Sequence, residues 1–228
     1  RGLLPKSDAQ FRDWSVHYQY KPAGMVSGDY FDLIYPASDD GDLIFLLGDV
    51  SGKGVAASLL MSNLHAMFRS LASTNMELRT LMEMANRLFC QSTTAGQYAT
   101  LICGRAGRSG EIEIASAGHA PALVISPSGI KEIGSTGLPL GLFGTGRYTT
   151  SRVKLDPRDS LLLFTDGISE ANDAAGREYG IGGLSFAIRE RHGWPPKELV
   201  VACLGDVQRH SAGVRQADDQ TVMAIQRQ

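Results

Sequence analysis

Five short segments of the chain have a pattern of apolar and polar residues that is typical of β-strands: Leu43–Leu47, Glu111–Ala115, Leu123–Ile125, Leu161–Phe164 and Val222–Ile225. Leu43–Leu47 and Leu161–Phe164 contain no polar residue, which predicts strands that are covered on both faces. In Glu111–Ala115, glutamate and isoleucine alternate, as expected for a strand with one solvated face. The pattern therefore predicts strands of two kinds, distributed over most of the chain.

Helices are predicted between these groups of strands. After Gly54, the apolar residues Leu60, Leu64, Met67 and Leu71 recur at spacings of three and four, which is the period of one helix face. Similar patterns, and a proline pair that can start a helix, give four expected helices: Val55–Ser73, Met76–Gln91, Gly182–His192 and Pro196–His210. Clusters of strands beside paired helices indicate an α+β fold with mainly antiparallel sheets rather than repeated βαβ units.

Composition and charge narrow the class of protein. The 228 residues are 43% apolar and carry a formal net charge of −2, without any run rich in Lys or Arg. Such a chain can bury a core, and it offers no electrostatic footprint for nucleic acid or an anionic membrane. No apolar run exceeds six residues and no signal peptide pattern is present, so we expect a cytoplasmic domain. We expect residues 1–13 to be the end of an upstream linker, and 14–228 to form one domain.

Acidic residues next to glycine, at the ends of expected strands, are the main candidates for chemistry. Asp49 and Asp166 follow the two buried runs, whereas Asp29 and Asp218 precede other apolar segments. Antiparallel pairing could bring all four to one edge, where their charges would repel unless cations compensated them. Carboxylate oxygens suit Mg²⁺ or Mn²⁺, and two such ions about 4 Å apart can activate a bridging water. The sequence therefore predicts metal-assisted hydrolysis of a phosphate ester.

Each of these residues also has an ordinary structural reading. Asp-Gly pairs such as Asp166-Gly167 are common in turns, Asp49 could cap the following helix, and Asp218-Asp219 could be a solvated turn. A lone histidine between strands, His119, is more often hydrogen-bonded than catalytic, and we expect a structural role. Lys53 is a candidate contact for a phosphate oxygen, although its flanking glycines are far too few for a P-loop. The metal interpretation depends on the four aspartates acting together.

Six motifs occur in an order that resembles the PPM/PP2C superfamily, and more closely its bacterial stage-II-sporulation-E and sigma-regulator phosphatase branch. They span nearly the whole chain: Ser27–Asp32, Gly48–Gly54, Ala117–Pro121, Gly137–Gly141, Phe164–Glu170 and Asp218–Thr221. The resemblance implies an αββα sandwich of two mainly antiparallel sheets flanked by helices. It also implies a serine/threonine phosphatase that uses two Mn²⁺ or Mg²⁺ ions, with room for a third. An Arg for the substrate phosphate and a His for the leaving group, both known in the eukaryotic branch, have no clear counterpart here.

The resemblance assigns roles to individual residues. Asp49 would bridge the two ions and act, with Asp166, through the water that they activate. The Val50 carbonyl, Asp29 and Asp218 would complete the set of metal ligands. Asp219 would stand behind the ligands without direct ligation, and Asp32, which has no counterpart as a ligand, would orient Asp29 or bound water.

Kinship also suggests partners. The usual substrate in this branch is a phosphorylated antagonist of an anti-sigma factor, within a partner-switching pathway that controls a sigma factor. An upstream sensor or receiver domain commonly regulates the phosphatase. Two other functions remain open at this point: a catalytically silent phosphatase-like binding module, and a hydrolase of a small phosphoester. Neither nucleic acid nor membrane contact is expected of this domain.

Overall fold

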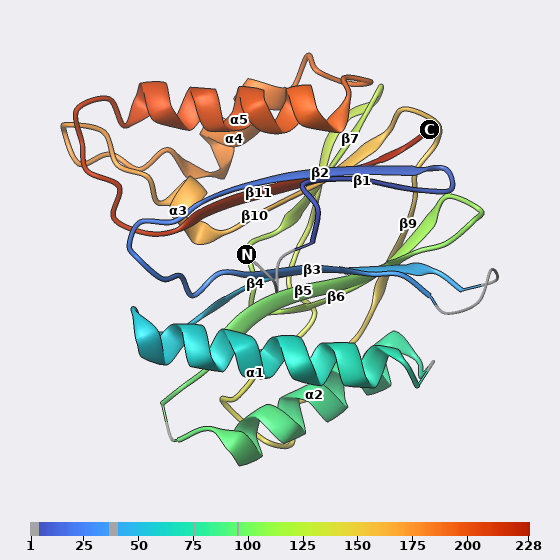
Figure 1. Ribbon diagram of the computed structural model, residues 1–228. Coiled ribbons are helices and arrows are strands. Elements are labelled where there is room, and N and C mark those ends of the chain that lie inside the picture. The colour runs from blue at the N-terminus through green and yellow to red at the C-terminus, as the bar shows by residue number, and fades with distance from the viewer. Residues whose placement is uncertain (1–4, 37–40, 75, 95) are drawn as a thin grey trace. The chain divides into compact units, whose positions relative to one another are not determined.

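The computed structural model describes residues 5–36, 41–74, 76–94 and 96–228 (Figure 1). The chain divides into two compact units, each built around one antiparallel sheet. The first unit contains Val26–His119 and Gly134–Lys154, and the second contains Lys6–Met25, Ala120–Ile133 and Leu155–Gln228. The α+β class and the two antiparallel sheets predicted from the sequence are confirmed.

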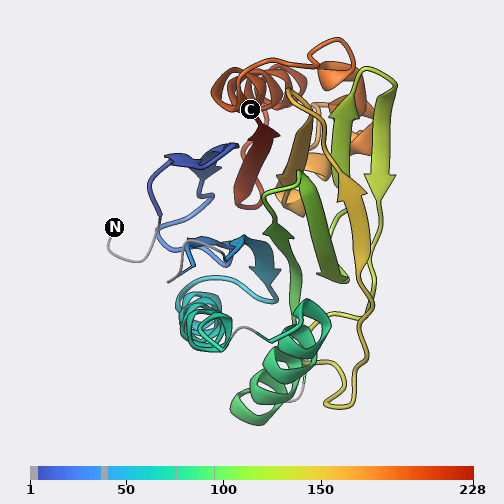
Figure 2. The same cartoon turned by 90° about the vertical axis from the view of Figure 1, so that its right-hand side faces the viewer.

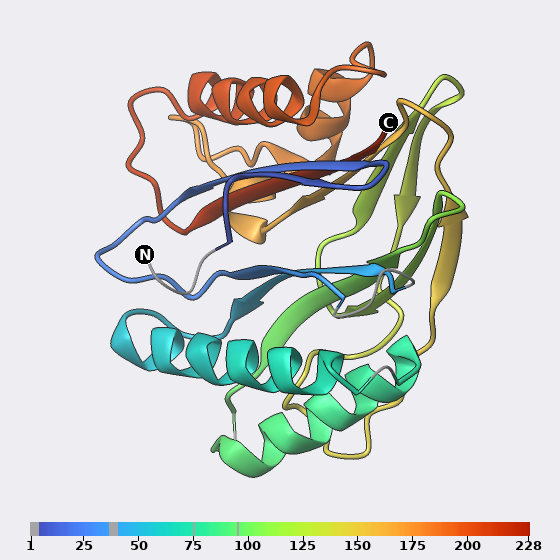
Figure 3. The same cartoon turned by 45° about the vertical axis from the view of Figure 1, so that its right-hand side comes forward.

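The first unit holds a five-stranded sheet in the order β3-β4-β5-β6-β9. Its strands are β3 (Tyr30–Ile34), β4 (Leu43–Val50), β5 (Ala99–Ala106), β6 (Glu111–Ala117) and β9 (Ser151–Lys154). The helices α1 (Val55–Ala72) and α2 (Leu78–Ser92) lie on one face of this sheet (Figure 1, Figure 3). Leu64 and Phe68 of α1 pack with Leu46 of β4 in one buried cluster, so the helical apolar stripe seen in the sequence faces the sheet.

The second unit holds a six-stranded sheet in the order β1-β2-β11-β10-β7-β8. Its strands are β1 (Asp8–Phe11), β2 (Trp14–Lys21), β7 (Ala122–Ser126), β8 (Gly129–Ile133), β10 (Ser160–Phe164) and β11 (Gln220–Arg227). Three helices belong to this unit: α3 (Asp166–Ser169), α4 (Gly180–Ile188) and α5 (Pro196–His210). Figure 2 shows α5 nearly end-on against this sheet, where Val200 and Leu204 pack with Ala224 of β11.

The five predicted strands lie within β4, β6, β7, β10 and β11, and the helix predicted at 196–210 has the observed bounds. The helix predicted at 182–192 instead spans Gly180–Ile188, and the one predicted at 76–91 spans Leu78–Ser92. Asp8–Phe11, within the segment expected to be the end of a linker, pairs with β2 as the edge strand β1. Residues 1–4 of that segment lie outside the described residues. Within the part of the chain that the structure describes, no helix combines the length and apolar character needed to span a membrane.

Candidate metal centre

Two of the predicted metal ligands lie at neighbouring positions in the first unit. Asp49 is the penultimate residue of β4, and Asp29 immediately precedes β3. The two strands are antiparallel, with Tyr30 opposite Gly48, so the next step of this register brings Asp29 opposite Asp49. Adjacent strand pairing therefore accounts for the proximity of two aspartates that are 20 positions apart in the sequence.

Gly28 lies directly against two oxygen atoms at the end of β4. A Cβ atom at position 28 would lie 3.0 Å from Asp49 Oδ1 and 3.1 Å from the Val50 carbonyl oxygen. Asp29 follows Gly28 and is only 3% exposed. The carboxylate of Asp49 and the carbonyl of Val50 thus converge beside Gly28, where a side chain would crowd both oxygens. A donor set made only of oxygen atoms fits the hard ions Mg²⁺ and Mn²⁺.

Hydrogen bonds hold the loops around this group of oxygens. The Ser27 hydroxyl accepts from the Asp29 amide at 3.0 Å, and the Ser58 hydroxyl in the first turn of α1 donates to the Ser27 carbonyl at 3.0 Å. Ser51 and Tyr98 exchange two further bonds, both 2.9 Å long. Lys53 lies exposed between these anchored segments. Its contact with a substrate phosphate stays a prediction.

The second unit carries the other predicted ligands, Asp166 and Asp218. Asp166 begins α3, with Thr165 between it and β10, and β10 pairs with β11 so that Phe164 is opposite Val222. The Thr165 amide donates to the Thr221 carbonyl at 3.1 Å, which continues this pairing toward both aspartates. A Cβ atom at Gly167 would lie 2.0 Å from the Asp219 carbonyl oxygen. The segments that carry Asp166 and Asp218 are therefore in direct backbone contact.

Residues 39–228 match the family model described as Stage II sporulation protein E (SpoIIE). The chain belongs to the SpoIIE family. This membership, together with likeness to solved PP2C phosphatase domains, confirms the family and the fold that the six motifs predicted.

Several curated relatives resemble this SpoIIE-family chain. Protein IcfG of Synechocystis is 25% identical over 256 residues, which cover 100% of the chain and 40% of that protein. Phosphoserine phosphatase RsbU of Bacillus subtilis is 28% identical over 158 residues, which cover 68% of the chain and 46% of that protein. The chain thus spans less than half the length of these relatives.

Solved structures show the same fold. The RsbU and RsbW domains of Rv1364c from Mycobacterium tuberculosis superpose with a TM-score of 0.81 at 26% identity, covering 94% of the chain and 60% of that structure. The SiaA-PP2C domain of Pseudomonas aeruginosa gives a TM-score of 0.82 at 18% identity, covering 93% of the chain and 85% of that domain. RsbX in complex with magnesium gives a TM-score of 0.71 at 15% identity, covering 97% of the chain and 98% of that structure.

The predicted ligands of this SpoIIE-family chain are thus divided between the units, with Asp29, Asp49 and Val50 in the first and Asp166 and Asp218 in the second. Among the residues that the structure describes, no group of three His, Cys, Asp or Glu side chains is arranged to hold a metal ion. That all four aspartates share one metal centre stays a prediction.

Asp219 and Glu170 lie beside the second pair of aspartates. Asp219 is 7% exposed, and its Oδ1 atom accepts a 2.7 Å hydrogen bond from the Ala23 amide. This bond fits the expected position of Asp219 behind the ligands. Burial raises the pKa of Glu170, and the charges of Asp166, Glu178 and Asp218 raise it further. Sequence reasoning did not single out Glu170, although its position four residues after Asp166 was a usable signal.

Asp32 forms a buried ion pair with α1. Its carboxylate is fully buried and accepts hydrogen bonds of 2.8 and 2.7 Å from the Arg69 guanidinium of α1. This bond to Asp32 raises the pKa of Arg69. The Leu33 amide also donates to Asp32, at 2.8 Å. Asp32 therefore joins β3 to α1, and each of its oxygens accepts a hydrogen bond from Arg69.

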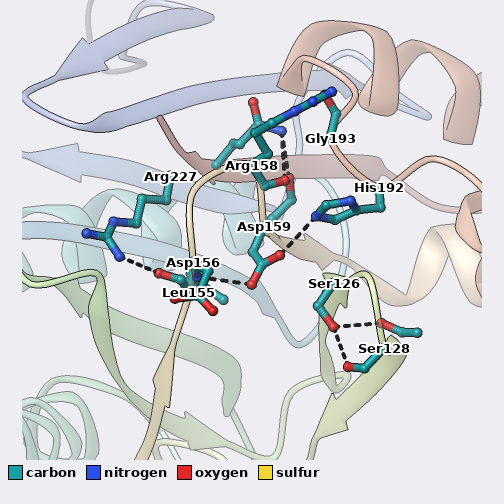
Figure 4. Close-up of polar contacts among 12 residues, drawn as sticks. Ser126, Ser128, Leu155, Asp156, Arg158, Asp159, His192, Gly193 and Arg227 are labelled. Carbon is teal, nitrogen blue, oxygen red and sulfur yellow. Dashed lines mark hydrogen bonds and ion pairs between the residues drawn. The ribbon is translucent and has the colours of Figure 1, made fainter.

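His119 and Asp159 are buried polar residues with structural contacts. His119 Nδ1 lies 3.0 Å from the hydroxyl oxygen of Thr100, a contact that fits the expected structural role. Figure 4 shows Asp159 in the second unit between His192 Nε2, at 2.9 Å, and the Asp156 amide, at 3.0 Å. These bonds fix the turn between β9 and β10. A buried carboxylate of this chain is therefore not by itself a sign of catalysis.

Replacing Gly167 by alanine should destabilise the second unit, because the new methyl group would overlap the Asp219 carbonyl and force backbone movement. We expect the free energy of unfolding in urea to fall by about 3 kcal/mol, in the upper range for overpacking. Gly182→Ala in α4 is the matched control, since nothing lies within 4 Å of the added atom. Equal unfolding midpoints for the two variants would contradict the tight packing at Gly167.

Proposed function

We propose that this chain is a metal-dependent phosphatase that hydrolyses phosphoserine or phosphothreonine in a regulatory protein. The observation that carries the proposal is the convergence of Asp49 Oδ1 and the Val50 carbonyl on the space left by Gly28. SpoIIE-family membership and relatives named phosphoserine phosphatases, RsbU and RsbP of Bacillus subtilis, support the reaction. A catalytically silent binding module is not favoured, because aspartate is present at all four expected ligand positions.

The residues around Gly28 fit a divalent metal ion, because they offer oxygen donors of both required kinds, carboxylate and carbonyl. Asp29, Asp49 and Val50 would hold one side of a two-ion centre, and Asp166 and Asp218 the other. The magnesium complex of RsbX, which shares the fold, supports Mg²⁺ or Mn²⁺. When bound, such ions supply Lewis acidity and a water molecule that is more easily deprotonated.

The residues of the chain itself would position the substrate and preserve the ligand geometry. Asp219 would keep the Asp218 segment in place through its bond to the Ala23 amide. Lys53, exposed in the loop before α1, would contact the substrate phosphate as a mobile point charge. Its ammonium would add a positive charge from the chain itself to the charge that bound metal ions supply at the phosphoryl oxygens.

The proposed substrate is a phosphorylated antagonist of an anti-sigma factor, and an upstream sensor or receiver domain would regulate the activity. Support comes from the sigma-regulator branch of the family, to which RsbU and RsbP are related. The chain spans 46% of RsbU and 38% of RsbP, which leaves room in such relatives for regulatory segments.

Metal removal tests the proposed function. The chain would be assayed with an aryl phosphate and with a phosphoserine peptide, after EDTA treatment and during a Mn²⁺ titration. We expect hydrolysis of both to disappear with EDTA and to return, with saturation, as Mn²⁺ is added. A rate that is the same with and without EDTA would refute the proposal. Hydrolysis of the aryl phosphate alone, with no activity on any phosphopeptide, would favour a small phosphoester instead.

A further inference from the structure

A pocket of about 340 Å³ lies entirely within the second unit, beside the predicted ligands Asp166 and Asp218. Gly167 and Asp218 form part of its wall, together with side chains from the segments after α3 and after α5. Its volume is at the low end of the range for small-ligand sites, roughly 300–1,000 Å³, and suits a single side chain. No ligand or substrate group has been assigned to this pocket so far.

Gln220 and Ser211 line this pocket with buried polar atoms. Gln220 is only 5% exposed, and its Nε2 atom donates to the Gly167 carbonyl at 3.1 Å, which fixes the orientation of the amide. Gln220 Oε1 and Ser211 Oγ are both buried, and neither has a hydrogen-bond partner among the described residues. A buried acceptor without a partner costs free energy, so this side of the pocket is suited to a ligand that donates hydrogen bonds.

The charges around Gln220 favour a cationic donor over a neutral one. Glu170 and Glu178 both line the pocket. Asp218 adds a third carboxylate to the wall, against two basic side chains, Lys21 and Arg215. Acidic groups are therefore in excess around this pocket, and they offer oxygen acceptors.

We propose that this pocket binds a Lys or Arg side chain of the substrate protein, close in sequence to its phosphorylated serine. The proposal rests on the proposed function, because the pocket borders Gly167 and Asp218. The residues of the substrate protein that flank its phosphoserine would therefore reach the pocket. The ammonium or guanidinium would donate to Gln220 Oε1 and pair with Glu170 and Glu178. The pocket would thus select substrates by a charge next to the reacting group.

A phosphopeptide series tests this assignment. Seven-residue phosphoserine peptides on an alanine background would carry Arg, Lys, Gln or Glu in turn at each of the three positions on either side. We expect one position at which Arg or Lys raises kcat/KM at least about fivefold over Ala, while Glu lowers it. A preference for Gln equal to that for Arg would overturn the cationic ligand, and the absence of any position dependence would overturn the pocket.

Charge reversal at Glu178 tests whether this pocket is the site that binds the basic side chain of the substrate. The measure is the ratio of kcat/KM for the best Arg peptide to that for the all-Ala peptide, so a general loss of activity cancels. Glu178→Lys should reduce this ratio to about one, whereas Glu198→Lys, an equal charge change at an exposed position of α5, should leave it unchanged. Equal ratios for both variants would overturn the assignment.

The wild type distinguishes failure of this assignment from failure of the proposed function. If the wild type hydrolyses an aryl phosphate with Mn²⁺ but shows no preference among the peptides, only the pocket assignment fails. If it hydrolyses neither the aryl phosphate nor any peptide, the phosphatase proposal fails, and the pocket assignment fails with it.

Discussion

Replacing Asp49 by asparagine should lower the rate of phosphate ester hydrolysis at saturating Mn²⁺ by about 1,000-fold. Asparagine keeps the shape of the side chain beside Gly28 but removes the charge of the proposed bridging ligand. Metal ions contribute several kcal/mol of charge stabilisation in such reactions, and each 1.4 kcal/mol or so corresponds to a tenfold change in rate. Steady-state kinetics with an aryl phosphate, over a range of Mn²⁺ concentrations, would measure the loss.

Thermal unfolding separates loss of metal binding from loss of folding. Ions that bind only the folded state raise its stability, so Mn²⁺ should raise the Tm of the wild type but not that of Asp49→Asn. The matched control is Asp13→Asn, which removes the same charge from an exposed position, and it should retain both the rate and the Tm response. If Asp49→Asn hydrolysed the substrate as fast as this control, Asp49 would not be a metal ligand.

The strands that could be predicted from the sequence have continuous apolar runs, such as β4 and β10, or the regular alternation of β6. β2 was not predicted, because polar residues interrupt its apolar pattern. One of these polar residues, His17, is nevertheless buried, with 4% exposure. β5 contains Gly104, which argues against a strand. In the structure, the ring of Phe45 fills the space beside this glycine, since a Cβ atom there would lie 2.1 Å from Phe45 Cζ. Cross-strand packing of this kind is a tertiary effect that local propensity cannot reveal.

The residues of the candidate site can be divided in the same way, into those that the local sequence identifies and those whose environment depends on tertiary contacts. Asp49 and Asp166 could be found because each follows a buried strand and adjoins a glycine. Asp32 was expected to orient Asp29 or bound water, but its environment depends on Arg69, which is 37 positions away on α1. The unpartnered oxygen of Gln220 likewise arises from the packing of β11 against Gly167. Motif spacing identifies residue types that can do chemistry, whereas partners brought by folding decide which of them are available.

Replacing Arg69 by methionine should lower the free energy of unfolding by about 3 kcal/mol. The Asp32 side chain is fully buried, and Arg69 supplies two of its hydrogen bonds. The remaining basic neighbour, His65, has its Nε2 atom 3.6 Å from Asp32. Removing one partner of a buried ion pair typically costs about 3–5 kcal/mol, and the partial exposure of Arg69 places our expectation at the lower end. Urea unfolding followed by circular dichroism would measure the change.

Two further variants test whether the loss of stability comes from leaving the buried Asp32 carboxylate without its partner. Arg79→Met makes the same change at an exposed position of α2, where the guanidinium is 3.8 Å from Glu83, and should cost less than about 0.5 kcal/mol. Combining Arg69→Met with Asp32→Asn should recover part of the stability, because no charge is then buried without its partner. If Arg69→Met cost no more than Arg79→Met, the Asp32–Arg69 pair would not secure α1 to β3. Asp32 is three residues from Asp29, so loss of the Asp32–Arg69 pair should also reduce the rise in Tm that Mn²⁺ causes.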